Sequence, residues 1–160
     1  MGLEVHMLTG DSQANADRMA AKLNVDHVHA SVSPERKQAL IHELQDAGQK
    51  VLMVGDGLND TLALTQAWAS IAPGTALEAS QNAADVVLLG QHLSGIPDVI
   101  HIARSARARI LENFGLAAAY NMVAIPLALA GFASPLMAAL AMSTSSITVT
   151  LNALRTRARP

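Results

Sequence analysis

Apolar and polar positions divide the chain into two unlike parts. Up to residue 112, short apolar runs alternate with charged and turn-forming segments, as in a domain where strands alternate with helices. Residues 113–154 contain no Asp, Glu, Lys, Arg or His. A membrane-spanning helix needs roughly 20 apolar residues, so the second part is long enough for about two spans. The pattern predicts an α/β domain followed by a two-helix transmembrane hairpin.

The first part has a series of short runs with the composition of strands. They cover residues 4–8, 26–30, 51–54, 70–72 and 85–89. Helical patterns lie between them and follow capping signals, with Asp11 or Ser12 before one helix and Ser33 with Pro34 before the next. Gly48 is expected to end that second helix. The alternation favours a parallel sheet covered by helices on both faces.

The second part is predicted to be almost entirely helical. A long helical segment begins at Ser94, and its first residues, 94–110, form a connector. The first span covers residues 111–132 with a kink at Pro126, and the second covers 136–154 after a short turn at 131–135. Arginines flank both spans, at positions 104, 107, 109, 155, 157 and 159. The positive-inside rule therefore predicts that both flanks and the α/β part are cytoplasmic.

Composition excludes some classes of function. With 160 residues, 51% of them hydrophobic, the chain can form one domain with an appendage. The net charge of −2 and the few aromatic residues give no reason to expect nucleic-acid binding. Because there is no cysteine, the chain has neither a disulfide framework nor a thiolate metal site.

The turn at residues 55–60 is the strongest candidate site. Its sequence, Gly-Asp-Gly-Leu-Asn-Asp, follows an apolar strand directly, at the strand end where open α/β sheets bind ligands. Asp56 and Asp60 offer the carboxylate oxygens that Mg²⁺ prefers. The alternative is a plain strand-to-helix turn in which Asn59 or Asp60 caps the following helix.

Two further segments have features of a phosphate site. Thr9, Gly10 and Asp11 follow the first strand and precede a helix, where a hydroxyl and free N–H groups suit a phosphate; a simple helix cap is the alternative. Lys37 lies in the first turn of its helix, where a cation opposes the helix dipole. A residue that conflicts with its local structure in this way is typical of functional sites. The alternative is that Lys37 is an ordinary solvated side chain.

His27 and His29 alternate onto one face of their predicted strand, as paired metal ligands do. No third ligand is near them in the sequence, so a solvated strand face is the favoured interpretation.

Polar residues also interrupt the predicted spans. They are Tyr120, Asn121, Met142, Ser143, Thr144, Ser145, Ser146 and Asn152. Hydroxyls and amides in a membrane often serve only to hydrogen-bond neighbouring helices. The functional interpretation is a passage for a soft ion of low charge, because thioether ligands select Cu(I) and no carboxylate is present to neutralise a divalent cation.

Taken together, these motifs resemble the later part of the phosphorylation domain of P-type ATPases, a domain of the haloacid-dehalogenase-like (HAD) superfamily. In the family's order, they are Thr9-Gly10-Asp11, Pro34 with Lys37, and the turn at 55–60. The hairpin resembles the last two spans of the heavy-metal subgroup. The matching residues are Tyr120 and Asn121 for its Tyr-Asn pair, and Met142, Ser145 and Ser146 for its Met-x-x-Ser-Ser signature for monovalent copper. Residues 141–147 and 152–155 look similar to copper pumps that serve assembly of cbb3-type cytochrome oxidase.

The resemblance implies an incomplete HAD-like (Rossmann-type) sheet in an ATP-driven Cu(I) transporter of a bacterial inner membrane. It implies Mg²⁺ and ATP as cofactors, and the bilayer, Cu(I) and the pump's remaining domains as partners. The resemblance implies that Asp56, supported by Asp60, binds Mg²⁺. It implies that Thr9, Gly10 and Asn59 contact phosphoryl oxygens and that Lys37 neutralises phosphoryl charge. Asp11 is implied to belong to the catalytic set. The pair Thr61-Leu62 departs from the Ala-Pro that commonly follows in the family and is expected to alter only the start of the next helix.

Several motifs of the family are absent from the chain. They are the nucleophile motif Asp-Lys-Thr-Gly-Thr, the Cys-Pro-Cys metal ligands, the nucleotide-binding domain and the Thr-Gly-Glu motif. We therefore expect residues 1–93 to form a partial domain without its nucleophile strand, before the connector at 94–110 and the hairpin with its basic tail at 111–160. Alone, such a chain is expected neither to form an aspartyl-phosphate nor to pump copper, whether Met1 is a true start or a truncation.

Three other interpretations stay open. A non-catalytic, membrane-anchored HAD-like module would act by binding a partner, but a plain anchor has no need of polar residues in its spans. A small HAD-type phosphatase with a membrane tail would need the missing nucleophile strand. A pump for zinc or cadmium would be expected to carry an acidic or basic residue within the spans.

Overall fold

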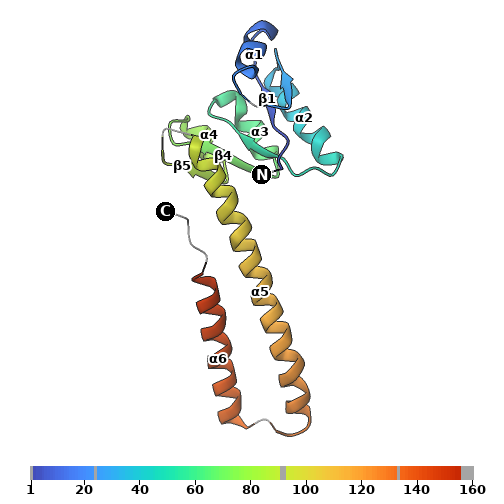
Figure 1. The fold of residues 1–160 in the computed structure, drawn as a ribbon, viewed down its shortest axis with the longest axis vertical. Helices are drawn as coiled ribbons and strands as arrows, with labels where there is room; N and C mark the ends of the chain where they lie inside the picture. Colours follow the sequence, from blue (N-terminus) through green and yellow to red (C-terminus); the bar gives the residue numbers. More distant parts are fainter. Residues whose placement is uncertain (1, 24, 91–92, 133, 156–160) are drawn as a thin grey trace. The chain divides into compact units, whose positions relative to one another are not determined.

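The computed structural model describes residues 2–23, 25–90, 93–132 and 134–155. They form two compact units, Met1–Leu93 and Ser94–Pro160 (Figure 1). Some predicted features lie outside the described residues: residue 133 of the turn, and Arg157 and Arg159 of the basic tail.

The first unit contains two short parallel sheets. Strand β1 (His6–Leu8) pairs with β2 (His27–His29), and β4 (Ala69–Pro73) lies between β3 (Leu52–Val54) and β5 (Val86–Leu88). The predicted alternation of parallel strands with helices is confirmed. The strands form two separate sheets, one of β1 and β2 and the other of β3, β4 and β5.

Helices connect the strands of this unit. They are α1 (Gln13–Ala20), α2 (Pro34–Asp46), the short 3₁₀ helix η1 (Leu58–Asp60), α3 (Thr61–Gln66) and α4 (Glu78–Ala83). Helix α2 begins as predicted, because the Ser33 hydroxyl accepts a hydrogen bond from the Arg36 N–H at 3.2 Å and Pro34 occupies the first turn. After α2, Gly48 has a φ of +83°, a conformation that favours glycine. Ser12 holds the N-cap position of α1 but makes no side-chain cap hydrogen bond.

A small apolar core holds α2 and α3 against the second sheet. It consists of Ile41 from α2, Met53 from β3, and Ala63 and Leu64 from α3. All four residues are buried. This core therefore packs α2, which connects β2 to β3 in the chain, against the second sheet.

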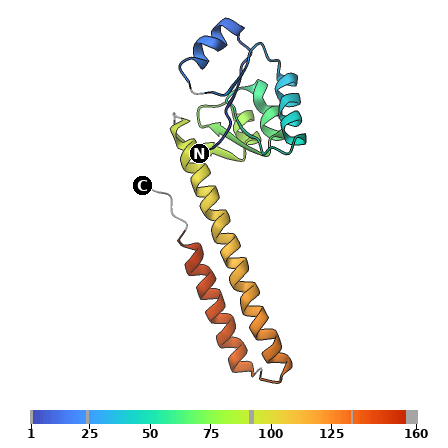
Figure 2. The same cartoon turned by 45° about the vertical axis from the view of Figure 1, so that its right-hand side comes forward.

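The second unit is a pair of helices, α5 (Ile96–Leu129) and α6 (Pro135–Ala153), which lie side by side in both views (Figure 2). Both are long and apolar enough to cross a membrane. Helix α5 runs from the predicted connector into the first span without a break, includes Pro126, and ends at Leu129. It is preceded by a 3₁₀ turn, η2 (Leu93–Gly95).

A polar contact between Asn152 and Asn113 joins the two long helices. The Asn152 side-chain amide donates a hydrogen bond of 2.9 Å to the Asn113 side-chain oxygen. Hydrogen bonds between helices in a membrane stabilise their association by about 0.6 kcal/mol on average, with a maximum near 2 kcal/mol. The contact therefore stabilises the hairpin at the end distant from its turn.

We predict that Asn152→Leu loosens this end of the hairpin, because it removes the donor of the hydrogen bond. Since the chain has no native cysteine, spin labels can be attached to cysteines introduced at positions 111 and 154. Electron spin resonance should show a broader distance distribution between the labels in the variant. The matched control is Asn121→Leu, whose side chain makes no hydrogen bond among the described residues. An equal broadening in both variants would contradict the assignment.

Candidate functional site

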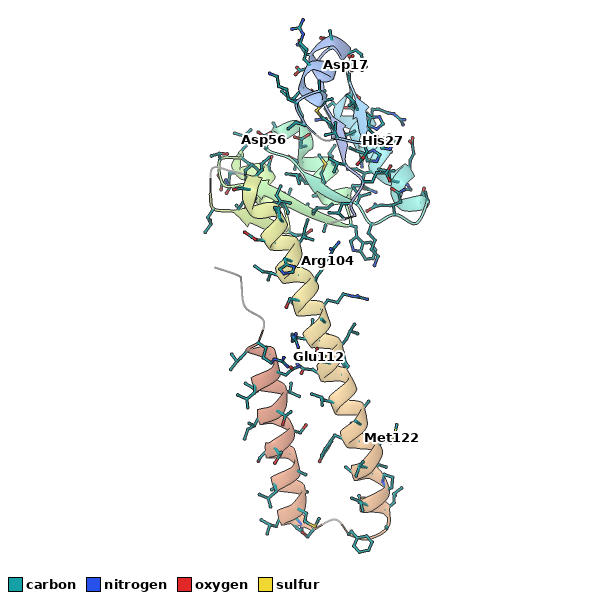
Figure 3. The ribbon with its side chains drawn as sticks, viewed as in Figure 1. Asp17, His27, Asp56, Arg104, Glu112 and Met122 are labelled. Carbon is teal, nitrogen blue, oxygen red and sulfur yellow. The ribbon has the colours of Figure 1, made fainter. Side chains whose placement is uncertain are left out.

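The loop after β3 carries the first predicted carboxylate. Asp56 follows the strand directly after Gly55, and its side chain is exposed (Figure 3). Helix α4 holds this loop in place, because the Ser80 hydroxyl donates a 2.7 Å hydrogen bond to the Gly57 carbonyl. Ser80 is fully buried, so this contact is protected from water. The sequence thus places an accessible carboxylate on a well-supported loop.

Asp60 lies against the backbone of the same loop. A Cβ atom added at Gly55 would lie only 2.8 Å from the Asp60 Cβ and 3.1 Å from its Cγ. Glycine is therefore required at position 55 for Asp60 to approach this closely. Asp60 stands at the N-cap position of α3 but makes no side-chain cap hydrogen bond, so its carboxylate is not used in the way that the plain-turn alternative predicts.

Lys37 and Asp60 form an ion pair. The Lys37 Nζ lies 2.7 Å from the Asp60 Oδ1, and the two side chains are only 13% and 12% exposed. The pair connects α2, which follows the first sheet, to the loop that follows β3 of the second sheet. The structure therefore brings together two predicted site residues that lie far apart in the sequence.

The turn after β1 is tied to the turn after β2. The Asp11 N–H donates a 3.1 Å hydrogen bond to the Thr9 hydroxyl, and the Val32 N–H donates to the Thr9 carbonyl at 3.0 Å. Gly10 and Asp11 are exposed. Within residues 2–23 and 25–90, no side-chain hydrogen bond joins Thr9 or Asn59 to Asp56, Asp60 or Lys37. That Thr9 and Asn59 belong to the same site as these residues therefore stays a prediction.

Helix α3 begins at Thr61, where the sequence departs from the Asn-Asp-Ala-Pro pattern. The Thr61 hydroxyl donates a 2.9 Å hydrogen bond to the Leu58 carbonyl of the preceding 3₁₀ turn. Asp60 keeps its ion pair with Lys37 immediately before this helix start.

In the second unit, a groove of about 490 Å³ lies between α5 and α6. Its lining includes Tyr120 from α5 together with Ala141, Thr144, Ser145 and Thr148 from α6. The other predicted ion-binding residues do not line this groove: Asn121, Met142 and Ser146 are exposed. Met142 and Ser146 are four residues apart and so share a face of α6 next to the groove.

The hydroxyl groups of α6 divide into two sets. Four of them donate hydrogen bonds of 2.8–2.9 Å to carbonyls of the preceding turn: Ser143, Thr144, Thr148 and Thr150. The hydroxyls of Ser145 and Ser146 make no such bond within the described part of the helix. The two serines of the predicted signature are thus the ones left free to bind another group.

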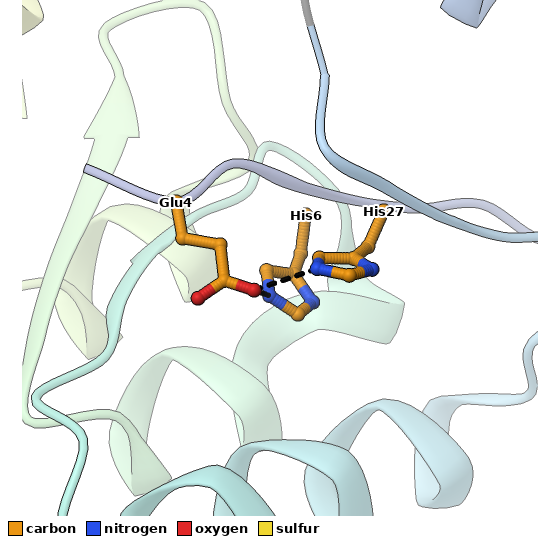
Figure 4. A group of neighbouring side chains, drawn as sticks. All are labelled: Glu4, His6 and His27. Atoms are coloured by element: carbon orange, nitrogen blue, oxygen red, sulfur yellow. Dashed lines mark hydrogen bonds and ion pairs between the residues drawn. The ribbon is translucent and has the colours of Figure 1, made fainter. Parts of the chain in front are cut away.

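A histidine-rich cluster that the sequence did not predict lies on β1 and β2. Glu4 and His6 lie beside His27, which corrects the expectation that no third ligand is near the histidine pair (Figure 4). Burial, followed by the neighbouring His6, His27 and Arg36, lowers the pKa of His29. The sequence feature that indicates this cluster is a repeated spacing: Glu4 and His6 are two residues apart, and so are His27 and His29.

The sequence of this chain is similar to those of several known proteins. A family model for haloacid dehalogenase-like hydrolases matches residues 1–67. The nitrogen fixation protein FixI of Rhizobium leguminosarum bv. viciae is 46% identical over 96% of this chain and 20% of its own length. The copper-exporting P-type ATPase of Staphylococcus aureus (strain JH9) is 44% identical over 97% of this chain and 19% of its own length.

A solved structure agrees over both units. The crystal structure of a zinc-transporting PIB-type ATPase in the E2.Pi state has a TM-score of 0.85 and 30% identity, covering 95% of this chain and 24% of that chain. The resemblance to the P-type ATPases is confirmed. The fold is of the predicted class, with HAD-like parallel sheets and helices followed by two long apolar helices. The chain spans about a fifth of the length of the curated relatives it matches.

We predict that Gly55→Ala destabilises the chain by about 1–3 kcal/mol, because the added methyl group forces Asp60 away from the loop. Urea unfolding of the detergent-solubilised chain, followed by Trp68 fluorescence, would measure the change in the free energy of unfolding. Gly10→Ala is the matched control, since its Cβ would meet nothing closer than 3.9 Å. An unchanged stability in Gly55→Ala would show that Asp60 does not need the close approach.

Proposed function

We propose that this chain supplies the Mg²⁺- and phosphoryl-binding half of the phosphorylation domain, together with two membrane spans, of an ATP-driven Cu(I) pump. The observation that carries the proposal is the ion pair between Lys37 and Asp60. It unites two motifs of the P-type ATPase pattern that are separated in sequence, at the loop where Asp56 is exposed. Phosphoryl transfer depends mostly on positioning and electrostatic stabilisation, which such a pair supports.

The loop residues fit a Mg²⁺ ion. Asp56 offers a carboxylate that makes no side-chain hydrogen bond or ion pair among the described residues, and Asp60 offers the oxygen that does not face Lys37. A hard cation with oxygen ligands would neutralise the charge of a bound phosphoryl group. Lys37 would share its ammonium between Asp60 and that group, while the Thr9 hydroxyl, the Gly10 N–H and the Asn59 amide would bind phosphoryl oxygens. Asp11 would keep the Thr9 hydroxyl in place through its own N–H.

The division of the strands into two sheets supports a place for a further strand. In the HAD superfamily the nucleophile strand lies between the strand that leads to Thr9 and the strand that leads to Gly55. Here these strands are β1 and β3, and each is at an edge, paired on one side only among the residues that the structure describes. We propose that the nucleophile strand and the ATP-binding domain belong to the remaining domains of the full-length pump.

The hairpin supports Cu(I) as the transported ion. The free hydroxyls of Ser145 and Ser146, the thioether of Met142, and the side chains of Tyr120 and Asn121 are soft or neutral donors. Residues 113–154 contain no carboxylate for a divalent cation, although a zinc-transporting ATPase has a similar fold. Because Met142 and Ser146 lie outside the groove between α5 and α6, we propose that they face other spans of the pump, which would complete the ion site.

The arginines that flank the two spans indicate which parts of the chain are cytoplasmic. Arg104, Arg107 and Arg109 precede the charge-free segment in α5, and Arg155 follows α6. We propose that these flanks and the first unit are cytoplasmic, in the inner membrane of a bacterium.

We predict that Asp56→Asn in the full-length pump abolishes ATP-dependent copper transport, because it removes the exposed carboxylate proposed to hold Mg²⁺. Uptake of copper into inverted membrane vesicles would measure it. The matched control is Asp46→Asn, which removes an exposed carboxylate on α2 that pairs with His42. This variant should transport copper normally. Transport by Asp56→Asn at the unmodified rate would exclude the Mg²⁺ assignment.

We predict that Met142→Leu impairs copper transport at least about tenfold while ATP binding stays unchanged, because leucine nearly conserves the volume but removes the soft ligand. Met122→Leu on α5 (Met122 is labelled in Figure 3) is the matched control. Met122 and Met142 are similarly exposed, at 77% and 72%. Parallel loss of transport and ATP binding in Met142→Leu would indicate misfolding in place of ligand loss. Equal transport by both variants would argue against Met142 as a ligand.

A further inference from the structure

The cluster on β1 and β2 brings ligand atoms from separate segments to one point. The parallel register pairs His6 with His27 and Leu8 with His29, so the three histidines lie on one face of the sheet. Glu4, in the segment before β1, directs one carboxylate oxygen at two rings (Figure 4). Its Oε1 lies 2.6 Å from the His27 Nε2 and 3.5 Å from the His6 Nε2.

The spacing of these atoms suits a small metal ion. One ligand atom from each of Glu4, His6 and His27 lies within 4.8 Å of the others. Around a tetrahedral Zn²⁺ with bonds of about 2.0–2.1 Å, ligand atoms are about 3.3 Å apart. The Glu4–His6 separation is already close to this value, and a small side-chain rotation would open the Glu4–His27 contact to it.

A fourth residue orients the cluster. The His6 Nδ1 lies 3.4 Å from the His29 Nε2, on the side of the His6 ring opposite the atom that faces Glu4. Histidines that bind a metal commonly donate their second ring N–H to such a partner, which fixes the ring and its tautomer. His29 would therefore be a positioning residue for His6.

Backbone contacts hold the segment before β1 in place. The Asp26 and His27 N–H groups donate to the Val5 carbonyl at 2.9 and 3.1 Å, and the Val5 N–H donates to the Asp26 carboxylate at 2.7 Å. Because these bonds flank Glu4, His6 and His27, the ligands are brought together before any ion binds.

We propose that Glu4, His6 and His27 form a binding site for a divalent transition-metal ion of the Zn²⁺ class, with His29 supporting His6. Imidazole and carboxylate ligands suit Zn²⁺ and Cu²⁺, whereas Mg²⁺ prefers oxygen alone and Cu(I) prefers sulfur. Three protein ligands leave a position for water. The site differs in position and ligand chemistry from both the Asp56 loop and the hairpin, so it does not depend on the proposed pump activity. A bound ion would clasp β2 to β1 and to the segment before it.

The test uses the full chain, purified in detergent without a histidine tag, with Zn²⁺ as the probe in isothermal titration calorimetry. We expect one Zn²⁺ per chain from the unmodified protein. His27→Gln and Glu4→Gln should each weaken binding at least about tenfold, and His29→Gln about 10–100-fold, as expected for the loss of an orienting partner. His101→Gln, which removes an exposed histidine of α5, is the matched control and should bind as the unmodified chain does. Circular dichroism would verify that each variant is folded.

A second readout distinguishes binding at this cluster from adsorption elsewhere. Substitution by Co²⁺ should give the visible absorption of a site with nitrogen and oxygen ligands, and His27→Gln should remove it. The proposal is overturned if the unmodified chain binds no Zn²⁺, if His27→Gln and Glu4→Gln bind as tightly as the unmodified chain, or if His101→Gln alone loses binding. In each of these cases the cluster is only an ion pair between Glu4 and the histidines.

Discussion

The ion pair between Lys37 and Asp60 is the interaction on which the candidate phosphoryl site depends. It lies between α2 and the loop after β3, with both side chains mostly withdrawn from water. Removing either partner of such a pair leaves a poorly solvated charge, which is strongly destabilising. Gly55 makes the pair possible by letting Asp60 approach the loop backbone, and Ser80 holds the loop from the other side. The ion pair and a small apolar core thus hold α2, which follows β2 in the chain, against the loop and the helix that follow β3.

The same arrangement relates the fold to its proposed activity. The pair holds Lys37 near the loop that presents Asp56, and this ammonium and the two carboxylates are the groups proposed to bind a phosphoryl group and Mg²⁺. Among the described residues, β1 and β3 are each paired on one side only, and the proposed nucleophile strand would pair with their open edges. In the described part of the hairpin, most hydroxyls of α6 bond to their own helix, and the two that do not, those of Ser145 and Ser146, belong to the predicted copper signature. In the proposed function, each unit would hold part of a site that other segments of the pump complete.

Local signals in the sequence predicted much of this fold. The strand at β3, the Ser33 cap with Pro34, and the end of α2 at Gly48 depend on neighbouring residues alone, and all are present. Contacts between distant segments were harder to predict. The histidine cluster requires the register of β1 against β2, which a single sequence does not reveal, and Glu4 lies outside the strand that carries His6. Similarly, the Met142 and Tyr120 motifs indicated one ion passage, but their faces on α5 and α6 follow from how the helices pack.

A double-mutant cycle on Lys37→Met and Asp60→Asn tests the central claim most directly. Urea unfolding of the detergent-solubilised chain, followed by the fluorescence of its single tryptophan, Trp68, would give the four free energies of unfolding. If the pair holds the two parts of the site together, the coupling energy between the substitutions should be about 1–3 kcal/mol. Effects that add to within about 0.5 kcal/mol would contradict the account, because Lys37 and Asp60 would then be independent side chains.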